Sequence, residues 1–244
     1  MRTSDVIRKW PGEEASEKAD TYHLLGCKQY ISEDFTSALR SHQGALAIRR
    51  KLYGEGHSDT ADSYQLIGCT QNELGDFTSA LQSAKRALDI KGKLFGEQHP
   101  DTADCYHLLG WTQHEQHDFA SALRSAQRAL GIRRELFGEV QSSTAYSYHL
   151  LGWTHHELND FSSALQCALR GLRIRLKIFG EEDIRTADSY YLLGWTLYEL
   201  GNFDSAMQSA WRALHFRRRL LGEEHPDTTD SQRLIGLTDR KSVV

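Results

Sequence analysis

Histidine is the first residue type in this sequence that suggests chemistry, because imidazole binds metals and moves protons near neutral pH. His107 and His114 lie seven residues apart, and His149 and His156 have the same spacing. In a helix this spacing separates two side chains by about 10.5 Å along the axis, whereas zinc ligands all lie about 2 Å from the ion. We therefore expect no metal site and no cofactor, and interpret these histidines as the polar lining of a binding surface.

Serine and aspartate also occur together, as in Asp62-Ser63 and Asp188-Ser189, and could belong to a hydrolase. A catalytic site needs one asymmetric set of groups, but these pairs recur at equivalent places along the chain. The sequence contains no nucleophile elbow, phosphate loop or metalloprotease motif. We expect no catalytic residues and no enzyme activity.

The elements that position these residues follow from an internal repeat of 42 residues. Aromatic residues and glycines mark equivalent places in each copy, and a repeat of this length is typical of a solenoid. The marker tyrosines are Tyr22, Tyr64, Tyr106, Tyr148 and Tyr190, and the marker phenylalanines are Phe35, Phe77, Phe119, Phe161 and Phe203.

Each repeat has the signals of two helices. In the third, Pro100-Asp101 suits a first helical turn, and apolar residues then follow at helical spacing. A turn of the Gly75-Asp76-Phe77 type, or one with Asn159, separates the helices, and aspartates such as Asp118 cap the second one. Gly138 ends it.

One such hairpin cannot bury its apolar stripe alone, so neighbours must stack. We predict an all-α fold, a right-handed superhelical α-solenoid of stacked antiparallel helix pairs. The expected organisation is a remnant of an upstream second helix at 1–12, five tandem hairpins at 13–224, a single capping helix at 225–240 and a tail at 241–244.

Composition limits the remaining classes of function. The 244 residues carry a formal net charge of −4, which favours neither nucleic acid nor a membrane surface. No apolar run reaches the length of a membrane span. Four cysteines occur without a CxxC pair, so we expect a reduced, cytoplasmic protein.

The repeat columns resemble the tetratricopeptide repeat. The family's pattern of an aromatic residue, Leu-Gly, Gly-Asp-Tyr/Phe and two alanines is met by Tyr64, Ile67-Gly68, Gly75-Asp76-Phe77, Ala80 and Ala87. The usual unit of that family has about 34 residues, and the second helix here is longer by about two turns. This extended form is similar to the repeats of kinesin light chains and nephrocystin-3-like proteins, and to repeat tails of some signalling NTPases.

Two departures from better-defined members limit what the resemblance implies. Kinesin light chains carry an asparagine pair where this chain has His107-Leu108 and His149-Leu150. Chaperone-type members clamp a carboxylate with Lys, Asn and Arg, where this chain has His107 with Trp111 and His149 with Trp153. The resemblance therefore implies neither kinesin cargo binding nor a carboxylate clamp.

The resemblance implies a binding groove, because one stripe of each first helix lines the concave face in this family. We interpret the stripe as a tryptophan spine with an acidic flank, suited to a protein or peptide ligand with apolar or basic character. In an alternative interpretation the tryptophans pack between successive first helices as an internal ladder. The stripe comprises His107, Trp111, His114, His149, Trp153, His156, Tyr191, Trp195 and Tyr198, flanked by Glu115, Glu157 and Glu199.

Two other functions stay open beside a binding scaffold. Basic residues cluster late in each second helix, as in Arg133-Arg134 and Arg217-Arg218-Arg219. They could follow the phosphates of a nucleic acid, although we favour compensation of the helix dipole. The array could also be an architectural or self-association segment of a larger signalling NTPase-type protein. We expect a monomer.

Overall fold

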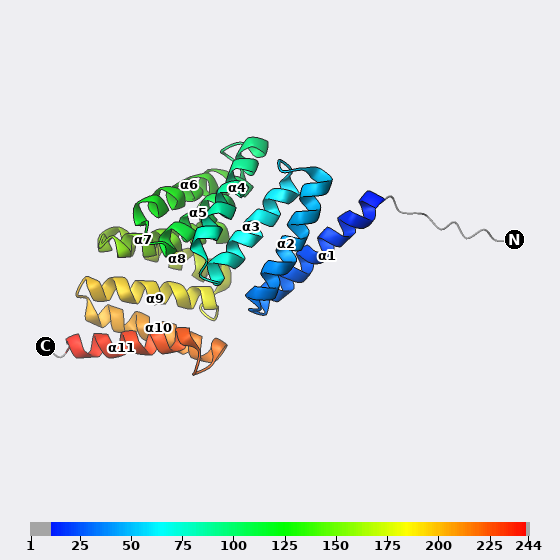
Figure 1. Cartoon of the computed structure of the whole chain (residues 1–244). Helices are drawn as coiled ribbons and strands as arrows, with labels where there is room; N and C mark the ends of the chain where they lie inside the picture. Colours follow the sequence, from blue (N-terminus) through cyan, green and yellow to red (C-terminus); the bar gives the residue numbers. More distant parts are fainter. Residues whose placement is uncertain (1–10, 243–244) are drawn as a thin grey trace. The chain divides into compact units, whose positions relative to one another are not determined.

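The computed structural model describes residues 11–242, and within them every regular element is an α-helix (Figure 1). Residues 1–10 of the expected upstream helix remnant lie outside this range, and so do the last two residues of the expected tail. The helices are α1 (Pro11–Ile31), α2 (Phe35–Tyr53), α3 (Ser58–Glu73), α4 (Phe77–Phe95), α5 (Pro100–Glu115), α6 (Phe119–Phe137), α7 (Ser142–Glu157), α8 (Phe161–Phe179), α9 (Ile184–Glu199), α10 (Phe203–Leu221) and α11 (Pro226–Ser242).

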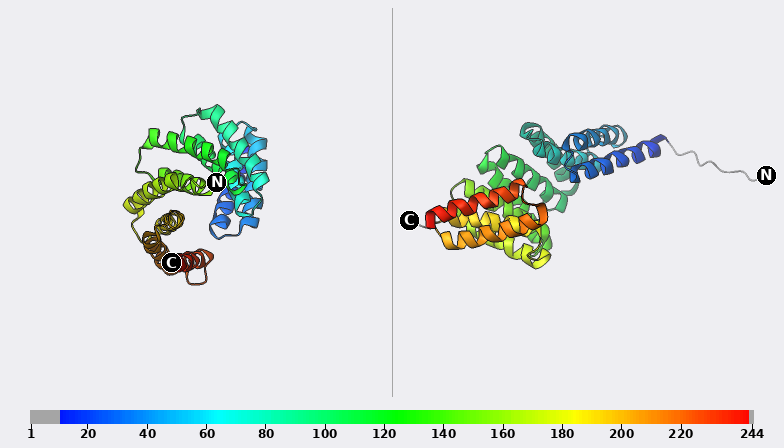
Figure 2. Two further views of the ribbon diagram at one scale, coloured as in Figure 1. Left: turned by 90° about the vertical axis from the view of Figure 1, so that its left-hand side faces the viewer. Right: turned by 90° about the horizontal axis from the view of Figure 1, so that it is seen from below.

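The chain divides into two compact units, with unit 1 ending at Gln116 and unit 2 beginning at His117. In unit 1, α1 packs on α2 and α3 packs on α4. The second helix of each pair also packs against the helix that follows it, α2 against α3 and α4 against α5. Unit 2 repeats this arrangement with the pairs α7–α8 and α9–α10, and α11 packs on α10 (Figure 2). The predicted stack of helix hairpins is therefore present within each unit.

The turn inside each hairpin is built as the sequence predicts. The aspartate or asparagine before the second helix accepts a hydrogen bond from the backbone N–H three residues later, as Asp160 does from Ser163 at 3.1 Å. The residue before this cap has a positive φ. It is Gly75, Gly201 or Asn159, as expected, but also Glu33 with φ 62° and His117 with φ 60°, which shows that the cap imposes the turn on less favourable residues.

Four first helices, α3, α5, α9 and α11, begin at a side-chain cap that was not predicted from the sequence. His57, His99 and His225 each accept a hydrogen bond through Nδ1 from the backbone N–H two residues later, at 3.2 Å. Asp183 takes this position before α9. These loop histidines therefore stabilise helix starts.

Helix α1 differs from its counterparts because it includes positions that form a loop in the later repeats. Gly12 and Glu13 are helical, whereas the equivalent Gly54 and Glu55 lie in the loop before α3. Glu13 and Glu14 lie in the first turn, where negative charge is favoured, and the helix former Ala15 stands where the second repeat has the cap His57. The boundary expected at residue 12 does not coincide with a break in the helix.

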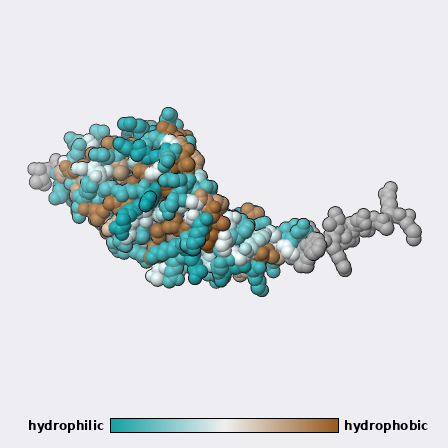
Figure 3. Space-filling view, turned by 90° about the horizontal axis from the view of Figure 1, so that it is seen from above, coloured by the Kyte–Doolittle hydropathy of each residue, from teal (hydrophilic) through white to brown (hydrophobic). Residues whose placement is uncertain are grey.

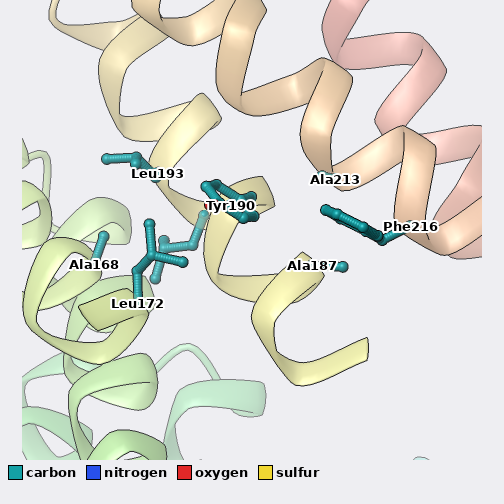
Figure 4. Packing of buried hydrophobic residues seen from close by; sticks show 8 residues of the cluster. Ala168, Leu172, Ala187, Tyr190, Leu193, Ala213 and Phe216 are labelled. Atoms are coloured by element: carbon teal, nitrogen blue, oxygen red, sulfur yellow. The ribbon is translucent and has the colours of Figure 1, made fainter. Parts of the chain in front are cut away.

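The hydrophobic core runs between the helices rather than through one centre. In unit 2, Tyr190 of α9 lies between Leu172 of α8 and Phe216 of α10 (Figure 4). Small residues such as Ala187 and Ala213 are fully buried beside it. Alanine columns let the backbones approach, and the aromatic rings fill the remaining volume.

The outer surface carries apolar side chains in patches separated by polar ones (Figure 3). None of the helices between residues 11 and 242 combines the length and apolar character that crossing a bilayer requires.

The equivalent glycines of the first helices differ in how much space surrounds them. A Cβ built on Gly194 would lie 3.0 Å from Cδ2 of Leu234, 3.4 Å from the backbone nitrogen of Ala210 and 3.5 Å from the backbone oxygen of Ala206. A Cβ on Gly236 would meet nothing within 4 Å. Close helix packing therefore requires glycine at 194 but not at 236.

We predict opposite effects for alanine at these two sites. Gly194→Ala should lower the free energy of unfolding by about 1–3 kcal/mol through overpacking. Gly236→Ala should raise it by up to about 1 kcal/mol, because alanine is the better helix former. Urea denaturation followed by circular dichroism measures both, and a loss of stability in Gly236→Ala would contradict the packing analysis.

His42 on α2 is a buried polar exception in unit 1. Its side chain is 1% exposed and neither ring nitrogen has a hydrogen-bond partner. Burial, with the nearby His23 and Arg49, lowers the pKa of His42 to about 4. The equivalent residues of the other repeats are Ala84, Ala126, Ala168 and Ala210, so the hairpin itself does not need an imidazole here.

This histidine should make unit 1 sensitive to acid. Below the ordinary pKa of 6.5 the unfolded chain binds a proton that the folded chain takes up only near pH 4. Stability should therefore fall between these values, by an amount on the order of 2–3 kcal/mol. His42→Ala should remove this part of the pH dependence, measured by chemical denaturation at pH 7 and pH 4.5, while His215→Ala at an exposed site should keep it.

Candidate functional site

The predicted site residues of unit 2 form a connected row of rings on α7 and α9, here called the aromatic row. The spacing of four and three residues places three rings on one face of each helix. The ring-centroid distances are 6.3 Å for His149–Trp153, 5.7 Å for Trp153–His156, 5.9 Å for Trp153–Tyr191, 6.4 Å for Tyr191–Trp195 and 5.9 Å for Trp195–Tyr198.

The tryptophans of the aromatic row are half-buried. Trp153 packs against the core cluster of α8, α9 and α10 and touches the ring of Tyr191 on the next first helix. The same indole keeps part of its surface accessible. Part of the Trp153 ring thus packs against the next first helix, and another part stays accessible to a ligand. The exposed-groove interpretation and the internal-ladder interpretation each describe only one part of this ring.

The two histidines of the row, His149 and His156, have different surroundings. Nε1 of Trp153 donates to Nε2 of His149 at 3.2 Å, so the accepting nitrogen carries no proton. Burial lowers the pKa of His156, against the opposing effect of Glu157 and Glu199. The row therefore combines aromatic faces with polar imidazole edges, and burial disfavours a positive charge on His156.

In unit 1 the predicted site residues lie on α5. Trp111 and His114 stack with their ring centroids 6.1 Å apart and an interplanar angle of 27°, and His107 lies one turn before Trp111. All three are half-buried. Beside α5, Asn72 of α3 donates to Oγ1 of Thr112 at 2.9 Å, which joins successive first helices below this surface.

The acidic flank lies at the C-terminal ends of the first helices. Glu157 and Glu199 are exposed and Glu115 is half-buried. Glu73, at the same position of α3, accepts a hydrogen bond from the Tyr30 hydroxyl at 2.8 Å. These carboxylates give each unit negative charge beside its aromatic side chains.

Metal and thiol chemistry have little support in this arrangement. Among residues 11–242, no group of three or more His, Cys, Asp or Glu side chains could hold a metal ion. Burial raises the pKa of Cys69 and Cys105 to about 12 and that of Cys167 to about 11. The thiols stay protonated, which makes them weak ligands and nucleophiles.

A column of buried cations is the main feature that the sequence analysis missed. One basic residue near the end of each second helix is almost fully buried, which neither phosphate binding nor compensation of the helix dipole predicts. Arg217, 4% exposed, donates to the backbone oxygen of Asp227 at 2.9 Å, to Oγ of Ser231 at 3.0 Å and to Oδ1 of Asp188 at 2.7 Å. The column consists of Arg49, Lys91, Arg133, Arg175 and Arg217.

The four arginines of the column each tie a hairpin to the next first helix. Arg175 donates to the backbone oxygen of Arg185 and to Oγ of Ser189 at 3.0 Å, repeating the pattern of Arg217. Lys91 is the exception, because Cys105 replaces the serine, and its ammonium instead binds Asp62 at 2.6 Å and Gln65 at 2.8 Å. The signal for this column in the sequence is an arginine followed 14 residues later by a serine, a pair that recurs with the 42-residue repeat except at Lys91.

One rung departs from the aspartate that usually faces this cation. Tyr146 stands where other first helices have Asp20, Asp62 or Asp188. The guanidinium of Arg175 lies 5.3 Å from the centroid of the Tyr146 ring, and burial lowers the pKa of this arginine. The surface of α7 is thus more aromatic and less acidic than that of its neighbours.

Comparison with known families agrees with the hairpins and their turns. The family described as Tetratricopeptide repeat matches residues 28–93 and 92–135, and a second description of the same name matches 144–185 and 186–227. The chain belongs to the tetratricopeptide repeat family. This confirms the family predicted from the columns, and no protein with a curated description matches the sequence.

Solved structures of repeat proteins share the fold at low sequence identity. BtubC (BKLC) from P. vanneervenii is 21% identical, with a TM-score of 0.72 over 88% of this chain and 85% of that one. A Podosopora anserina structure, described as a kinesin light chain with nearly identical TPR-like repeats, is 15% identical, with a TM-score of 0.67 over 84% and 97%. The apo form of RapI is 16% identical, with a TM-score of 0.65 over 89% and 57%. The similarity to kinesin light chain repeats is thereby confirmed at the level of the fold.

The buried cations should contribute more to stability than surface ion pairs do. Asp188→Asn keeps the shape at Arg217 but removes the negative charge, and should lower the free energy of unfolding by about 1–3 kcal/mol. Glu182→Gln breaks the exposed pair with Arg219, whose two side chains are 59% and 65% exposed, and should change it by less than about 0.5 kcal/mol. Equal losses in urea denaturation would contradict the proposed role of the column.

Proposed function

We propose that this chain is a non-catalytic scaffold that binds a partner protein or peptide on its first helices, with the aromatic row of unit 2 as the main contact. The observation that carries this proposal is the continuous set of half-buried rings from His149 to Tyr198. Large rings that are already fixed by their neighbours lose little entropy when a ligand covers them, which suits binding hot spots. The family supports the general role, because its repeats commonly mediate protein interactions.

The proposed ligand has apolar and basic side chains. Apolar groups would cover the faces of Trp153 and Trp195, and a lysine or arginine would pair with Glu157 or Glu199 or stack on a ring. Lowering of the His156 pKa by burial disfavours a competing positive charge on this ring. In unit 1, His107, Trp111, His114 and Glu115 offer a second surface of similar chemistry. A reducing compartment such as the cytoplasm suits the four free cysteines.

The alternative is an architectural segment that associates with copies of itself. We favour a monomer that binds other proteins, because a partly exposed aromatic row with an acidic flank suits a basic ligand better than an identical surface. Light scattering of the purified chain separates the two, and a stable dimer at micromolar concentration would favour the alternative.

Substitution of two tryptophans tests the proposed surface. Peptides selected by phage display against the intact chain should bind Trp153→Ala/Trp195→Ala at least tenfold more weakly, as expected for two hot-spot residues. Trp211→Ala is the matched control, because Trp211 lies on α10 of the same unit, is 52% exposed and stands outside the row. It should change the affinity less than about twofold.

Circular dichroism must show that the double variant keeps its helices. Selected peptides that bind the folded double variant as tightly as the intact chain would overturn the proposal, and so would a selection that yields no specific peptide.

A further inference from the structure

A basic hollow lies on the second helices of unit 2, away from the aromatic row. It has a volume of about 440 Å³ and opens between α6, the α6–α7 loop and α8. Four cations and one carboxylate surround an aliphatic part. We call it the basic niche, lined by Arg134, Glu139, Val140, Arg170, Arg173, Ile174 and Lys177.

The single carboxylate of the basic niche is already engaged. Oε2 of Glu139 accepts from Nε of Arg134 at 2.7 Å, and Oε1 accepts from the Tyr148 hydroxyl at 2.6 Å. Arg170 also lies 3.9 Å from Oε1 of Glu139. Glu139 is thus engaged by Arg134, Tyr148 and Arg170 beside the loop.

Arg173 and Lys177 are the unneutralised charges. They stand four residues apart on the exposed side of α8, and no carboxylate between residues 11 and 242 pairs with either. Like charges at this spacing destabilise a helix. The niche therefore has an excess of positive charge that its own fold does not compensate.

An equivalent hollow in unit 1 shows that the fold does not require this excess. It has a volume of about 320 Å³ and lies beside Glu55, Arg86, Asp89 and Lys93. Asp89 takes the place of Arg173 and pairs with Lys93 at 2.7 Å. The equivalent hollow of unit 1 neutralises its own charges, so the helix hairpin itself does not require the positive charge found in unit 2.

Apolar surface continues on the other side of the two free cations. A second hollow of about 540 Å³ is lined by Leu169, Leu172 and Leu176 together with Arg173 and Lys177. Leu169 is 46% exposed. The equivalent residues of the first three repeats are Gln43, Lys85 and Gln127. The fourth repeat, which carries the excess positive charge, therefore has the aliphatic Leu169 where the first three repeats have polar side chains.

We propose that the basic niche and the adjoining leucines bind an acidic, leucine-containing segment of a partner protein. Carboxylates of that segment pair with Arg173 and Lys177, where arginine can bind a carboxylate through two parallel hydrogen bonds. Its aliphatic side chains cover Val140, which is 41% exposed, and Leu169. A nucleic acid fits less well, because Glu139 and the apolar parts face a backbone that carries only negative charge.

This surface is separate from the aromatic row and prefers ligands of opposite charge. One chain could thus hold a basic ligand on its first helices and an acidic one on its second helices.

The test uses the full chain and a fluorescein-labelled peptide that contains six glutamates and two leucines, with the leucines placed between glutamates. In fluorescence anisotropy the double variant Arg173→Asp/Lys177→Glu should bind at least tenfold more weakly. These residues are natural at the equivalent positions, as Asp89 and Glu135, so the helix should tolerate them. The matched control Lys85→Glu/Arg124→Glu makes the same change in net charge at exposed sites outside the niche and should change the affinity less than about threefold.

Further arms decide between the possible ligands. A peptide with glutamine in place of glutamate, or with glycine in place of leucine, should bind at least fivefold more weakly, and Trp153→Ala/Trp195→Ala should bind the acidic peptide normally. Three outcomes would overturn the proposal. They are a charge control that weakens binding as much as the niche variant does, a glutamine peptide that binds as tightly as the acidic peptide, and a single-stranded oligouridine that binds more tightly than the acidic peptide. Loss of binding only in the tryptophan variant would assign the peptide to the aromatic row and would also overturn it.

Discussion

The structure depends on the contact between the end of one hairpin and the first helix of the next. A two-helix hairpin leaves an apolar face uncovered, and the following helix covers it with alanine, glycine and threonine columns that permit close approach. A buried cation completes this contact by satisfying a backbone oxygen and a serine hydroxyl across the junction, as Arg175 and Arg217 do. A charge in this place is costly unless every hydrogen bond is made, so the junction tolerates little change in geometry. At the four arginine junctions this requirement constrains the register of the following first helix and with it the direction of its exposed side chains.

The features specific to this protein occur where one copy departs from the repeat. Alanine becomes His42, aspartate becomes Tyr146, and the neutralising Asp89 becomes Arg173. Each departure leaves the hairpin intact but changes the charge or polarity of one rung. A repeat protein can vary such positions independently, because each rung contacts only its neighbours. The proposed binding surfaces are collections of these local changes on a common framework.

The two proposed surfaces of unit 2 use different helices of the same hairpins. The aromatic row belongs to α7 and α9, and the basic niche belongs to α6, α8 and the loop between α6 and α7. Their chemistry is opposite, since one combines aromatic rings with carboxylates and the other combines arginines with leucines. The fold relates the chain to BtubC and to kinesin light chain-like repeats. The ligands follow from the residues of this chain rather than from that similarity.

The sequence by itself determined the helices, the caps of the second helices and the family. Turn glycines, capping aspartates and apolar spacing act over a few residues, and their repetition makes the local signals unambiguous. It also placed the rings of the aromatic row on one face of each helix, because four residues correspond to about one helical turn. Only the tertiary structure decided which cation of a basic cluster is buried, as in Arg217 beside the exposed Arg218. It alone showed that Trp153 both packs on Tyr191 and keeps accessible surface. These outcomes depend on the angle and distance between three helices, which a periodic pattern along one chain does not specify.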